Sequence, residues 1–216
     1  MSGFNEFLIK ILTQFYHFKG VVVSKVFVFL ILICSYCLVL NAQSNKLVIA
    51  DFNKGDKLTN LGEDFGTWDK DPNDLTQDCK MSFAKDDALA LIGGMSLQLD
   101  YDVDSSNPAY NGFWLKISTA HVADFGTLSF YVKGDTRKGF TPKIKIELKD
   151  KRHGKASFFV ENITDKWQKI SLTLDPRSFD KNQPKPFEEF VVVFDDINSH
   201  PKTGRILIDQ IEFSKN

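Results

Sequence analysis

The sequence has few of the residues from which disulfide frameworks and metal sites are built. It contains three cysteines and four histidines in 216 residues. Cys34 and Cys37 lie in an apolar N-terminal segment, which leaves Cys79 in the rest of the chain. If that segment is removed, no intramolecular disulfide is possible. We therefore expect the folded part to be stabilised by its hydrophobic core or by a bound ion.

Motifs that support catalysis are also missing. His121, His153 and His200 lack the His-x-x-x-His or His-Glu-x-x-His spacing of metal hydrolases. The sequence has no Gly-x-Ser-x-Gly nucleophile motif, no glycine-rich phosphate loop and no dinucleotide-binding fingerprint. A net charge of −1 provides no basic surface, so we expect no nucleic-acid partner.

Adjacent carboxylates occur at Glu188–Glu189 and at Asp195–Asp196. A glycosidase needs two carboxyl groups about 5 to 9 Å apart across a cleft. Neighbouring residues of a strand point to opposite faces of the sheet, so neither pair is expected to act together. A mixed pair such as Glu147 with Asp196 is left open. The prediction is a protein that is not an enzyme.

The first 42 residues have the pattern of a secretory signal. Residues 26–40 form an apolar run, which follows Lys19 and Lys25 and precedes Ala42. A basic region, an apolar region and a small residue predict a signal peptide that is cut after Ala42. The alternative is an uncleaved membrane anchor, because about 20 apolar residues span a membrane. We expect the remaining chain to be secreted, periplasmic or part of the cell envelope, and to lie outside the membrane.

Most of the remaining sequence alternates between apolar and polar residues. Apolar residues occupy every second position in residues 95–103, and the pattern returns in residues 128–132, 144–148 and 170–174. A period of two is typical of a strand with one buried face. The continuous apolar run at residues 190–194 predicts a strand that is covered on both faces.

The last predicted strand covers residues 205–213. Its apolar phase changes near Asp209 and Gln210, which predicts a β-bulge there. No stretch of ten residues has a helical period, and turn-forming residues separate the strands at short spacing. We therefore predict an all-β fold, in which residues 43–216 form one antiparallel β-sandwich or jelly roll.

Several segments resemble a known group of β-sandwich domains. In chain order they are IADFNKGD, LQLDYDV, GFWLKI, LSFYVKGD, KIKIELKD, WQKISLTL and GRILIDQIEF. They resemble the successive strands of galactose-binding-like jelly rolls, and in particular the family-11 type of carbohydrate-binding module. Members of that family typically begin with Asp-Asp-Phe-Glu and end with an Ile-Asp-Asp-Ile strand. The resemblance implies a non-catalytic domain that binds a polysaccharide, with β-glucan as one candidate.

The resemblance also implies a structural calcium ion between the first and last strands. Asp51 and Asn53 occupy the first-strand positions, and Asp209 occupies the last-strand position. Calcium takes six to eight oxygen ligands. This sequence departs from the family because Asn53 replaces a Glu and Gln210 replaces an Asp, which removes two negative charges. The alternative is that these are polar residues at strand ends.

In the resemblance, the glycan lies on the outer face of one sheet. When the apolar residues of their strands face the core, Trp114 and Tyr131 face outward. An aromatic ring offers a flat apolar surface to a pyranose, and neighbours such as Glu147 and Lys149 can hydrogen-bond its hydroxyls. These four residues are therefore candidates for carbohydrate binding.

Two further aromatic residues are candidates for the same site. Tyr110 occupies a position at which the family often has a sugar-stacking tyrosine. Trp68 is expected in a long loop after the first strand, where it would close one edge of the groove. The alternative for each is an aromatic residue that caps the core, because amphipathic rings are commonly half-buried.

A protein-interaction or assembly domain with the same fold is the second functional hypothesis. Complex-assembly proteins of the intermediate-associated type resemble this chain in an early Asp-Phe, a Gly-Gly-x-Ser segment at residues 93–96 and a late Trp-Gln. They usually carry a Trp and an Asp ahead of the Gly-Gly pair, and Trp68 and Asp69 lie far from that position. An export signal also does not suit an organelle assembly factor. Carbohydrate binding is the first prediction, and a protein partner is left open.

Overall fold

The computed structural model describes residues 45–85, 94–117, 125–150, 154–174 and 187–215. The chain divides into two units, Met1–Ser44 and Asn45–Asn216. The predicted signal peptide, residues 1–42, lies outside the described residues and stays a prediction. Within the described ranges, no helix has the length and hydrophobicity that a membrane span requires.

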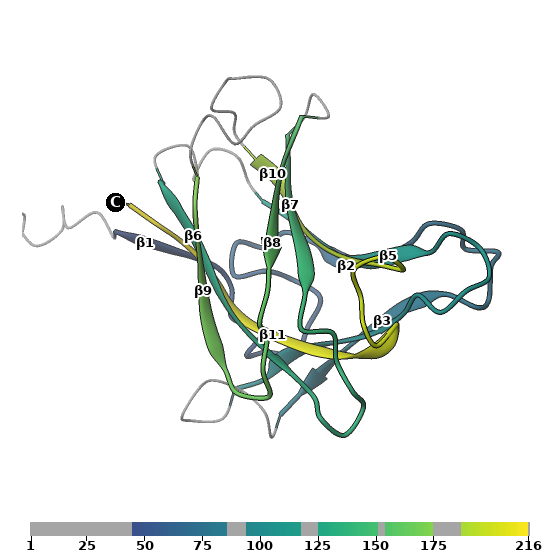
Figure 1. Ribbon diagram of the computed structural model, residues 1–216. Helices are drawn as coiled ribbons and strands as arrows, with labels where there is room; N and C mark the ends of the chain where they lie inside the picture. Colours follow the sequence, from purple (N-terminus) through teal and green to yellow (C-terminus); the bar gives the residue numbers. More distant parts are fainter. Residues whose placement is uncertain (1–44, 86–93, 118–124, 151–153, 175–186, 216) are drawn as a thin grey trace, which may run out of the picture. The chain divides into compact units, whose positions relative to one another are not determined.

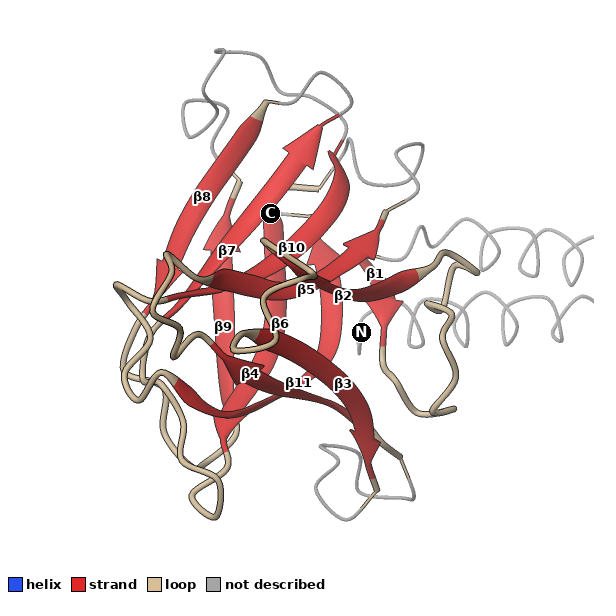
Figure 2. Cartoon of the chain, turned by 90° about the vertical axis from the view of Figure 1, so that its right-hand side faces the viewer, coloured by secondary structure: helices blue, strands red, loops and turns tan. Residues whose placement is uncertain are grey.

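The second unit consists of strands and the loops between them (Figures 1 and 2). The strands are β1 (Lys46–Ala50), β2 (Phe65–Asp69), β3 (Asp78–Ala84), β4 (Ser96–Asp102), β5 (Tyr110–Lys116), β6 (Thr127–Gly134), β7 (Ile144–Asp150), β8 (Lys155–Val160), β9 (Gln168–Thr173), β10 (Phe187–Asp195) and β11 (Thr203–Ser214). They form a six-stranded sheet in the order β3-β4-β11-β6-β9, with β1 also paired to β11, and a five-stranded sheet in the order β2-β5-β10-β7-β8. All pairings are antiparallel, which confirms the predicted all-β sandwich.

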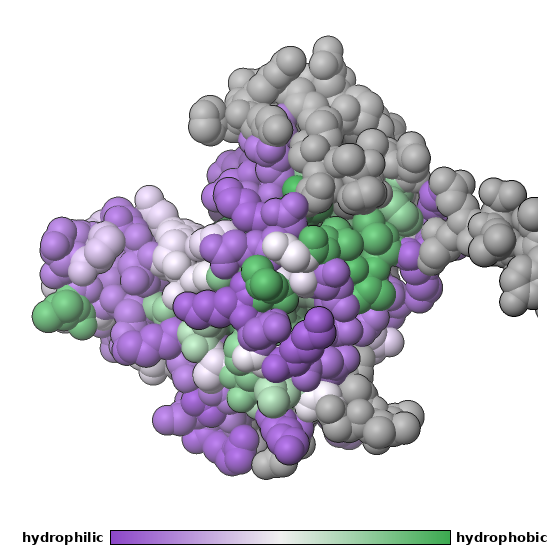
Figure 3. Space-filling view, turned by 180° about the vertical axis from the view of Figure 1, so that it is seen from behind, coloured by the Kyte–Doolittle hydropathy of each residue, from purple (hydrophilic) through white to green (hydrophobic). Residues whose placement is uncertain are grey.

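The predicted alternation corresponds to the buried faces of the strands. In β4, the side chains of Leu97, Leu99 and Tyr101 are buried in the core, while Gln98 and Asp100 are partly exposed. The apolar residues of β6 and β7 are buried in the same way, although Ser129 and Glu147 between them are buried as well. Hydrophilic residues cover most of the surface that Figure 3 shows, and hydrophobic residues occupy a smaller part of it. The hydrophobic effect therefore selects which side of each strand faces the other sheet.

The central strand of the five-stranded sheet is buried on both faces, as predicted from its continuous apolar run. Phe190, Val192 and Phe194 belong to the core between the sheets. Val191 and Val193 are also buried, but they line a groove on the outer face. Side chains of the neighbouring strands therefore have to cover the outer face of β10.

The predicted bulge in the last strand is also confirmed. The register between β11 and β6 shifts between Asp209 and Glu212, and Gln210 has a positive φ of 51°. The extra residue changes which side of the strand faces inward. Ile208 and Ile211 can therefore both belong to the core.

A buried asparagine that the sequence analysis did not single out connects the two sheets. Asn111, on β5, is fully buried. Its Nδ2 donates hydrogen bonds to the carbonyl oxygens of Asp78 and Asp102, at 2.8 and 2.5 Å. These carbonyls belong to β3 and β4, so one side chain joins the five-stranded sheet to the six-stranded sheet.

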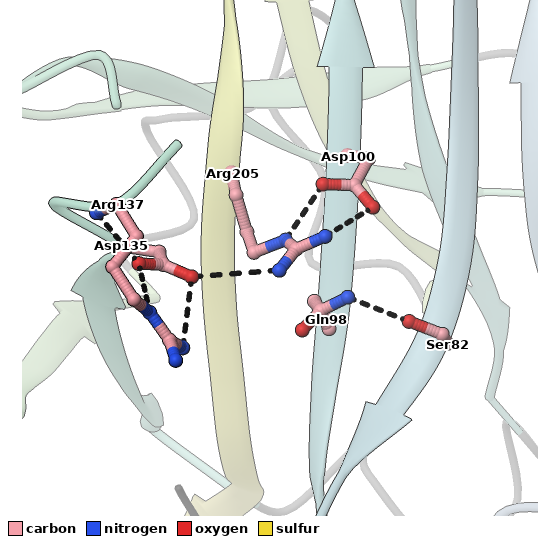
Figure 4. A network of polar contacts seen from close by, with 6 residues as sticks. All are labelled: Ser82, Gln98, Asp100, Asp135, Arg137 and Arg205. Atoms are coloured by element: carbon pink, nitrogen blue, oxygen red, sulfur yellow. Dashed lines mark hydrogen bonds and ion pairs between the residues drawn. The ribbon is translucent and has the colours of Figure 1, made fainter. Parts of the chain in front are cut away.

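An arginine-carboxylate network joins strands on the outer face of the six-stranded sheet (Figure 4). Arg205, on β11, donates from Nε and Nη2 to the two carboxylate oxygens of Asp100 on β4, at 2.7 and 2.8 Å. Its Nη1 donates to Asp135, in the turn after β6, at 3.4 Å. Asp135 also accepts a hydrogen bond from Nε of Arg137 at 3.1 Å. The network therefore links three adjacent parts of the sheet.

We predict that Asp135→Asn lowers the free energy of unfolding at pH 7 by about 2 kcal/mol, the usual size for a hydrogen bond to a charged group. Burial raises the pKa of Asp135, but hydrogen bonds and charges from Arg137 and Arg205 outweigh it, so the folded-state pKa is lowered. The carboxylate therefore stabilises the fold above its unfolded-state pKa of about 3.9, and this contribution is lost as the pH falls through the folded-state value.

Thermal unfolding of the two proteins between pH 3 and pH 7 measures this effect. The difference in melting temperature is expected to be largest at pH 7 and to shrink below about pH 4. Asp165→Asn is the matched control, because Asp165 is exposed and lines one surface hollow together with Asp135. A difference for Asp135→Asn that does not depend on pH would contradict the assignment.

Candidate functional site

A groove crosses the outer face of the five-stranded sheet. Its volume is about 720 Å³, within the range of about 300 to 1,000 Å³ that is usual for ligand sites. All five strands of the sheet contribute to its lining. The strand residues are Trp68, Tyr110, Trp114, Lys116, Lys145, Glu147, Lys149, Lys155, Glu189, Val191, Val193 and Asp195.

The pairing of the strands arranges these side chains in rows across the sheet. Trp114 on β5 lies opposite Val191 on β10, which in turn lies opposite Glu147 on β7. The next row has the same arrangement, because Glu189 on β10 lies between Lys116 on β5 and Lys149 on β7. The groove therefore has an aromatic half over β2 and β5 and a charged half over β7 and β8.

Each tryptophan of the aromatic half lies over a glycine of the neighbouring strand. Gly66 on β2 is paired with Trp114, and a Cβ atom at Gly66 would lie 3.1 Å from Cζ2 of the indole ring. Gly112 on β5 is paired with Trp68. A Cβ atom there would lie 1.9 Å from the carbonyl oxygen of Val192 on β10 and 3.3 Å from Nε1 of the Trp68 ring, so both neighbours require the glycine. A glycine in a strand often marks a close approach of this kind. The missing side chains leave room for both rings on the sheet.

Tyr110 extends the aromatic half at the start of β5. Its ring centroid is 5.7 Å from that of Trp68, and the side chain of Tyr110 is 41% exposed. Nε1 of Trp68 is buried and has no hydrogen-bond partner among the described residues. The ammonium of Lys116 lies 5.6 Å from the ring centroid of Trp114, within the range of a cation–π contact.

The charged half is organised around one buried carboxylate. Glu147 is 6% exposed. Its Oε1 lies 2.7 Å from Nζ of Lys145 and 3.1 Å from Nζ of Lys155, and its Oε2 lies 4.0 Å from Nζ of Lys149. Burial raises the pKa of Glu147, but the hydrogen bonds and charges of Lys145 and Lys155 outweigh it and lower the pKa below its usual value. Glu147 is therefore ionised at neutral pH.

The mixed carboxylate pair left open from the sequence, Glu147 with Asp196, lines the same groove. A glycosidase needs one carboxyl group with a raised pKa to protonate the leaving group. The pKa of Glu147 is lowered, which does not suit a proton donor. A carboxylate oxygen of Asp196 accepts a hydrogen bond from the backbone N–H of Ala109 at 3.2 Å.

The expectation that adjacent carboxylates point to opposite faces is wrong for both pairs. Asp196 follows the last residue of β10, so Asp195 and Asp196 both line the groove. The β10–β7 register shifts between Phe187 and Glu189, and both Glu188 and Glu189 line an adjoining hollow. The rule holds inside a regular strand, but it fails at a bulge and beyond a strand end.

The structure brings together five of the six residues that the sequence nominated for carbohydrate binding. Trp68, Tyr110, Trp114, Glu147 and Lys149 all line the groove. The expected loop position of Trp68 is wrong, because Trp68 belongs to β2, an edge strand of the sheet.

Tyr131 does not belong to this groove, which corrects its grouping with the other five. It lies on β6 of the six-stranded sheet and lines a different hollow, beside Lys169. Alternation predicts that a side chain points outward, but it does not predict which sheet the strand joins.

Other residues of the groove were missed. Lys145 has the outward parity of β7, so the alternation could have identified it. Lys155 belongs to β8, a short strand that was not predicted. Gly66 had no sequence signal, because its role depends on the pairing of β2 with β5.

The three residues proposed as calcium ligands are divided between two hollows. Asp51 lines one hollow, and its carboxylate accepts hydrogen bonds from Nδ2 of Asn60 and from the backbone N–H of Asn53. Asn53 and Asp209 line another, of about 320 Å³, together with Lys46 and Lys169. Glu212 lines this hollow too and accepts hydrogen bonds from both ammonium groups, so two carboxylates and two ammonium groups surround it.

The structure shows no group of three or more His, Cys, Asp or Glu side chains suited to a metal ion among the residues that it describes. Calcium therefore stays a prediction from the resemblance.

No protein-family model and no curated protein matches the sequence. Similar solved structures include the family 11 carbohydrate-binding module of cellulosomal cellulase Lic26A-Cel5E of Clostridium thermocellum, with 12% identity and a TM-score of 0.56, over 79% of this chain and 95% of that chain. The family 11 module from the same organism in complex with a β-1,3-1,4-mixed-linked tetrasaccharide has 13% identity and a TM-score of 0.54, over the same shares of the two chains.

An exo-β-agarase also matches, with 9% identity and a TM-score of 0.54, over 78% of this chain and 25% of that chain. These matches confirm, at the level of the fold, the resemblance to family-11 type modules. The same fold therefore occurs in carbohydrate-binding modules and in one part of a longer chain.

We predict that Gly66→Val displaces the indole ring of Trp114 without unfolding the domain. A side chain at residue 66 would contact the ring, and valine suits an edge strand. The near-ultraviolet circular dichroism and the fluorescence maximum are expected to change, while the melting temperature changes little. Ser157→Val, at an exposed position of the opposite edge strand, is the control. Unchanged spectra for Gly66→Val would show that the ring does not rest on the glycine.

Proposed function

We propose that this protein binds a polysaccharide in the groove on the five-stranded sheet, without catalysing a reaction on it. The observation that carries the proposal is the pair of tryptophan rings seated on glycines of adjacent strands, beside a row of charged side chains. Core aromatic residues pack between sheets, whereas these rings line an open groove on the outer face. Flat apolar surfaces with a few polar groups nearby are typical of sites that orient a ligand.

The two halves of the groove suit the two kinds of surface on a sugar. The C–H face of a pyranose is apolar and can stack on Trp114 or Tyr110. The hydroxyls can exchange hydrogen bonds with Lys145, Lys149 and the carboxylate of Glu189. Because the groove crosses all five strands, a chain of several sugars can lie along it.

The structural matches support this choice of ligand class. Two of them are carbohydrate-binding modules, and one was solved in complex with a β-1,3-1,4-mixed-linked tetrasaccharide. Mixed-linked β-glucan is therefore the first neutral ligand to test. The signal peptide stays a prediction from the sequence; a protein exported by it would lie outside the cytoplasm, where such polysaccharides occur.

Trp114→Ala is expected to weaken polysaccharide binding at least tenfold, equivalent to about 1.4 kcal/mol, because the main stacking surface is lost. Affinity gel electrophoresis with β-glucan, xylan, mannan and galactan measures the change. Tyr131→Ala is the matched control, since Tyr131 lies on the other sheet. It is expected to leave binding unchanged.

Two outcomes would contradict the proposal. If Trp114→Ala binds as tightly as the parent protein, the groove is not the site. If the folded parent protein binds none of the polysaccharides, the proposal fails, and a protein-interaction domain becomes the better hypothesis.

We propose separately that a calcium ion joins the first and last strands through Asp51, Asn53 and Asp209. A ligand present at 100 times its Kd stabilises a fold by about 2.7 kcal/mol, so chelation is expected to lower the melting temperature. Calorimetry with EDTA and with millimolar calcium measures the shift, and Asp209→Asn is expected to abolish it. A melting temperature that EDTA does not change would remove calcium from the description of the fold.

A further inference from the structure

The charged half of the groove contains three lysine side chains around one buried carboxylate, that of Glu147. Three ammonium groups, those of Lys145, Lys149 and Lys155, lie within 4.0 Å of Glu147. One lysine is enough to neutralise one carboxylate. Three ammonium groups around one carboxylate give this cluster a surplus of positive charge.

The positive groups of this cluster are more accessible to a ligand than the negative group. The side chains of Lys145, Lys149 and Lys155 are 25%, 39% and 46% exposed, whereas that of Glu147 is 8% exposed. Each ammonium has three N–H donors, so donors are left for a ligand after the contact with Glu147. The groove therefore presents ammonium groups above a carboxylate that is covered by them.

The other carboxylates around the groove limit the size of this positive region. Glu189 forms an ion pair with Lys116. Asp195 accepts hydrogen bonds from the backbone N–H groups of Ile197 and Asn198 at the other end of the groove. Asp150 and Glu188 line the adjoining hollow beside Lys149. Asp196 also lines the groove, so the four lysines of its lining are matched by four carboxylates, and the positive region is confined to the surroundings of Glu147.

This region lies at a fixed offset from the stacking surface. Trp114 and Glu147 both lie opposite Val191, so they are two strand spacings apart, about 10 Å. A sugar stacked on Trp114 would direct the next part of its chain across β10 toward the lysines. One ligand can therefore contact both halves of the groove.

We propose that Lys145, Lys149 and Lys155 form a subsite for the anionic group of an acidic sugar, so that the ligand is a polysaccharide bearing carboxylate or sulfate groups. The inference rests on the proposed function, since it concerns the same groove. A ligand anion would offset the surplus of positive charge and make charge-assisted hydrogen bonds with the three ammonium groups. A neutral glucan would leave that surplus in place.

Affinity electrophoresis of the purified full chain tests the inference with four probes. Polygalacturonate supplies carboxylates, dextran sulfate supplies sulfates, and mixed-linked β-glucan and dextran are neutral. We expect at least one anionic probe to bind at least tenfold more tightly than the neutral ones at 50 mM NaCl. This advantage should fall at 500 mM NaCl, because salt screens charges. Preference for polygalacturonate or for dextran sulfate identifies the anionic group.

Variants separate the subsite from general charge attraction. Lys149→Gln and Lys155→Gln are expected to weaken binding of the anionic probe at least fivefold. They are expected to weaken binding of the neutral probe much less, because the glutamine amide can still donate hydrogen bonds to sugar hydroxyls. Lys80→Gln, which removes an exposed lysine on β3 of the other sheet, is the matched control and should change neither. Trp114→Ala should weaken binding of both classes.

The results distinguish a failure of the lysine subsite from a failure of the proposed function. If β-glucan binds as tightly as both anionic probes and Lys149→Gln and Lys155→Gln change nothing, the subsite is wrong and the proposed function stands. If Lys80→Gln weakens anionic binding as much as Lys149→Gln, the attraction is nonspecific and the subsite is also wrong. If the folded protein binds none of the probes or the other polysaccharides, the subsite and the proposed function both fail.

Discussion

The outer face of the five-stranded sheet depends on the burial of β10 on both of its sides. Phe190, Val192 and Phe194 face the other sheet, and Val191 and Val193 face outward. If Val191 and Val193 were exposed, the fold would lose the free energy gained by burying their apolar surface, about 25 cal/mol per Å². Neighbouring strands must therefore provide side chains that cover them. Those covering side chains are the ones that form the groove.

The side chains that cover Val191 and Val193 leave part of the outer face open, and this opening is the groove. Trp114 lies beside Val191, and the glycine at position 66 lets its ring rest on the sheet instead of standing above it. On the other side of β10, the lysine stems of β7 and β8 can cover apolar surface while their ammonium groups reach water. The same residues thus shield a buried strand and present a surface with one aromatic and one charged half.

The two outer faces of the sandwich are used differently. On the six-stranded sheet, Arg205 joins Asp100 to Asp135 (Figure 4). On the same sheet, Glu212 accepts hydrogen bonds from Lys46 and Lys169. In the Arg205 network, each arginine charge faces a carboxylate, which suits a structural role. Around Glu147 the ammonium groups outnumber the carboxylate they surround. This imbalance distinguishes the groove from the Arg205 network, whereas the Glu212 cluster shares it in smaller measure, with two lysines around one carboxylate.

The sequence by itself determined several of the strands and which of their residues face the core. A period of two is local, so β4, β6, β7 and the bulge in β11 were visible without any knowledge of their partners. For the same reason, Trp114, Glu147 and Lys149 could be nominated as outward-facing before their neighbours were known.

Only the tertiary structure decided which strands share a sheet, because pairing depends on contacts between residues far apart in the chain. It separated Tyr131 from the groove, placed Trp68 in an edge strand, and paired Gly66 with Trp114. It also brought Lys155 next to Glu147, whose buried carboxylate holds the lysines together through charge. Alternation shows which side chains of a strand face outward, but it does not show which sheet the strand joins.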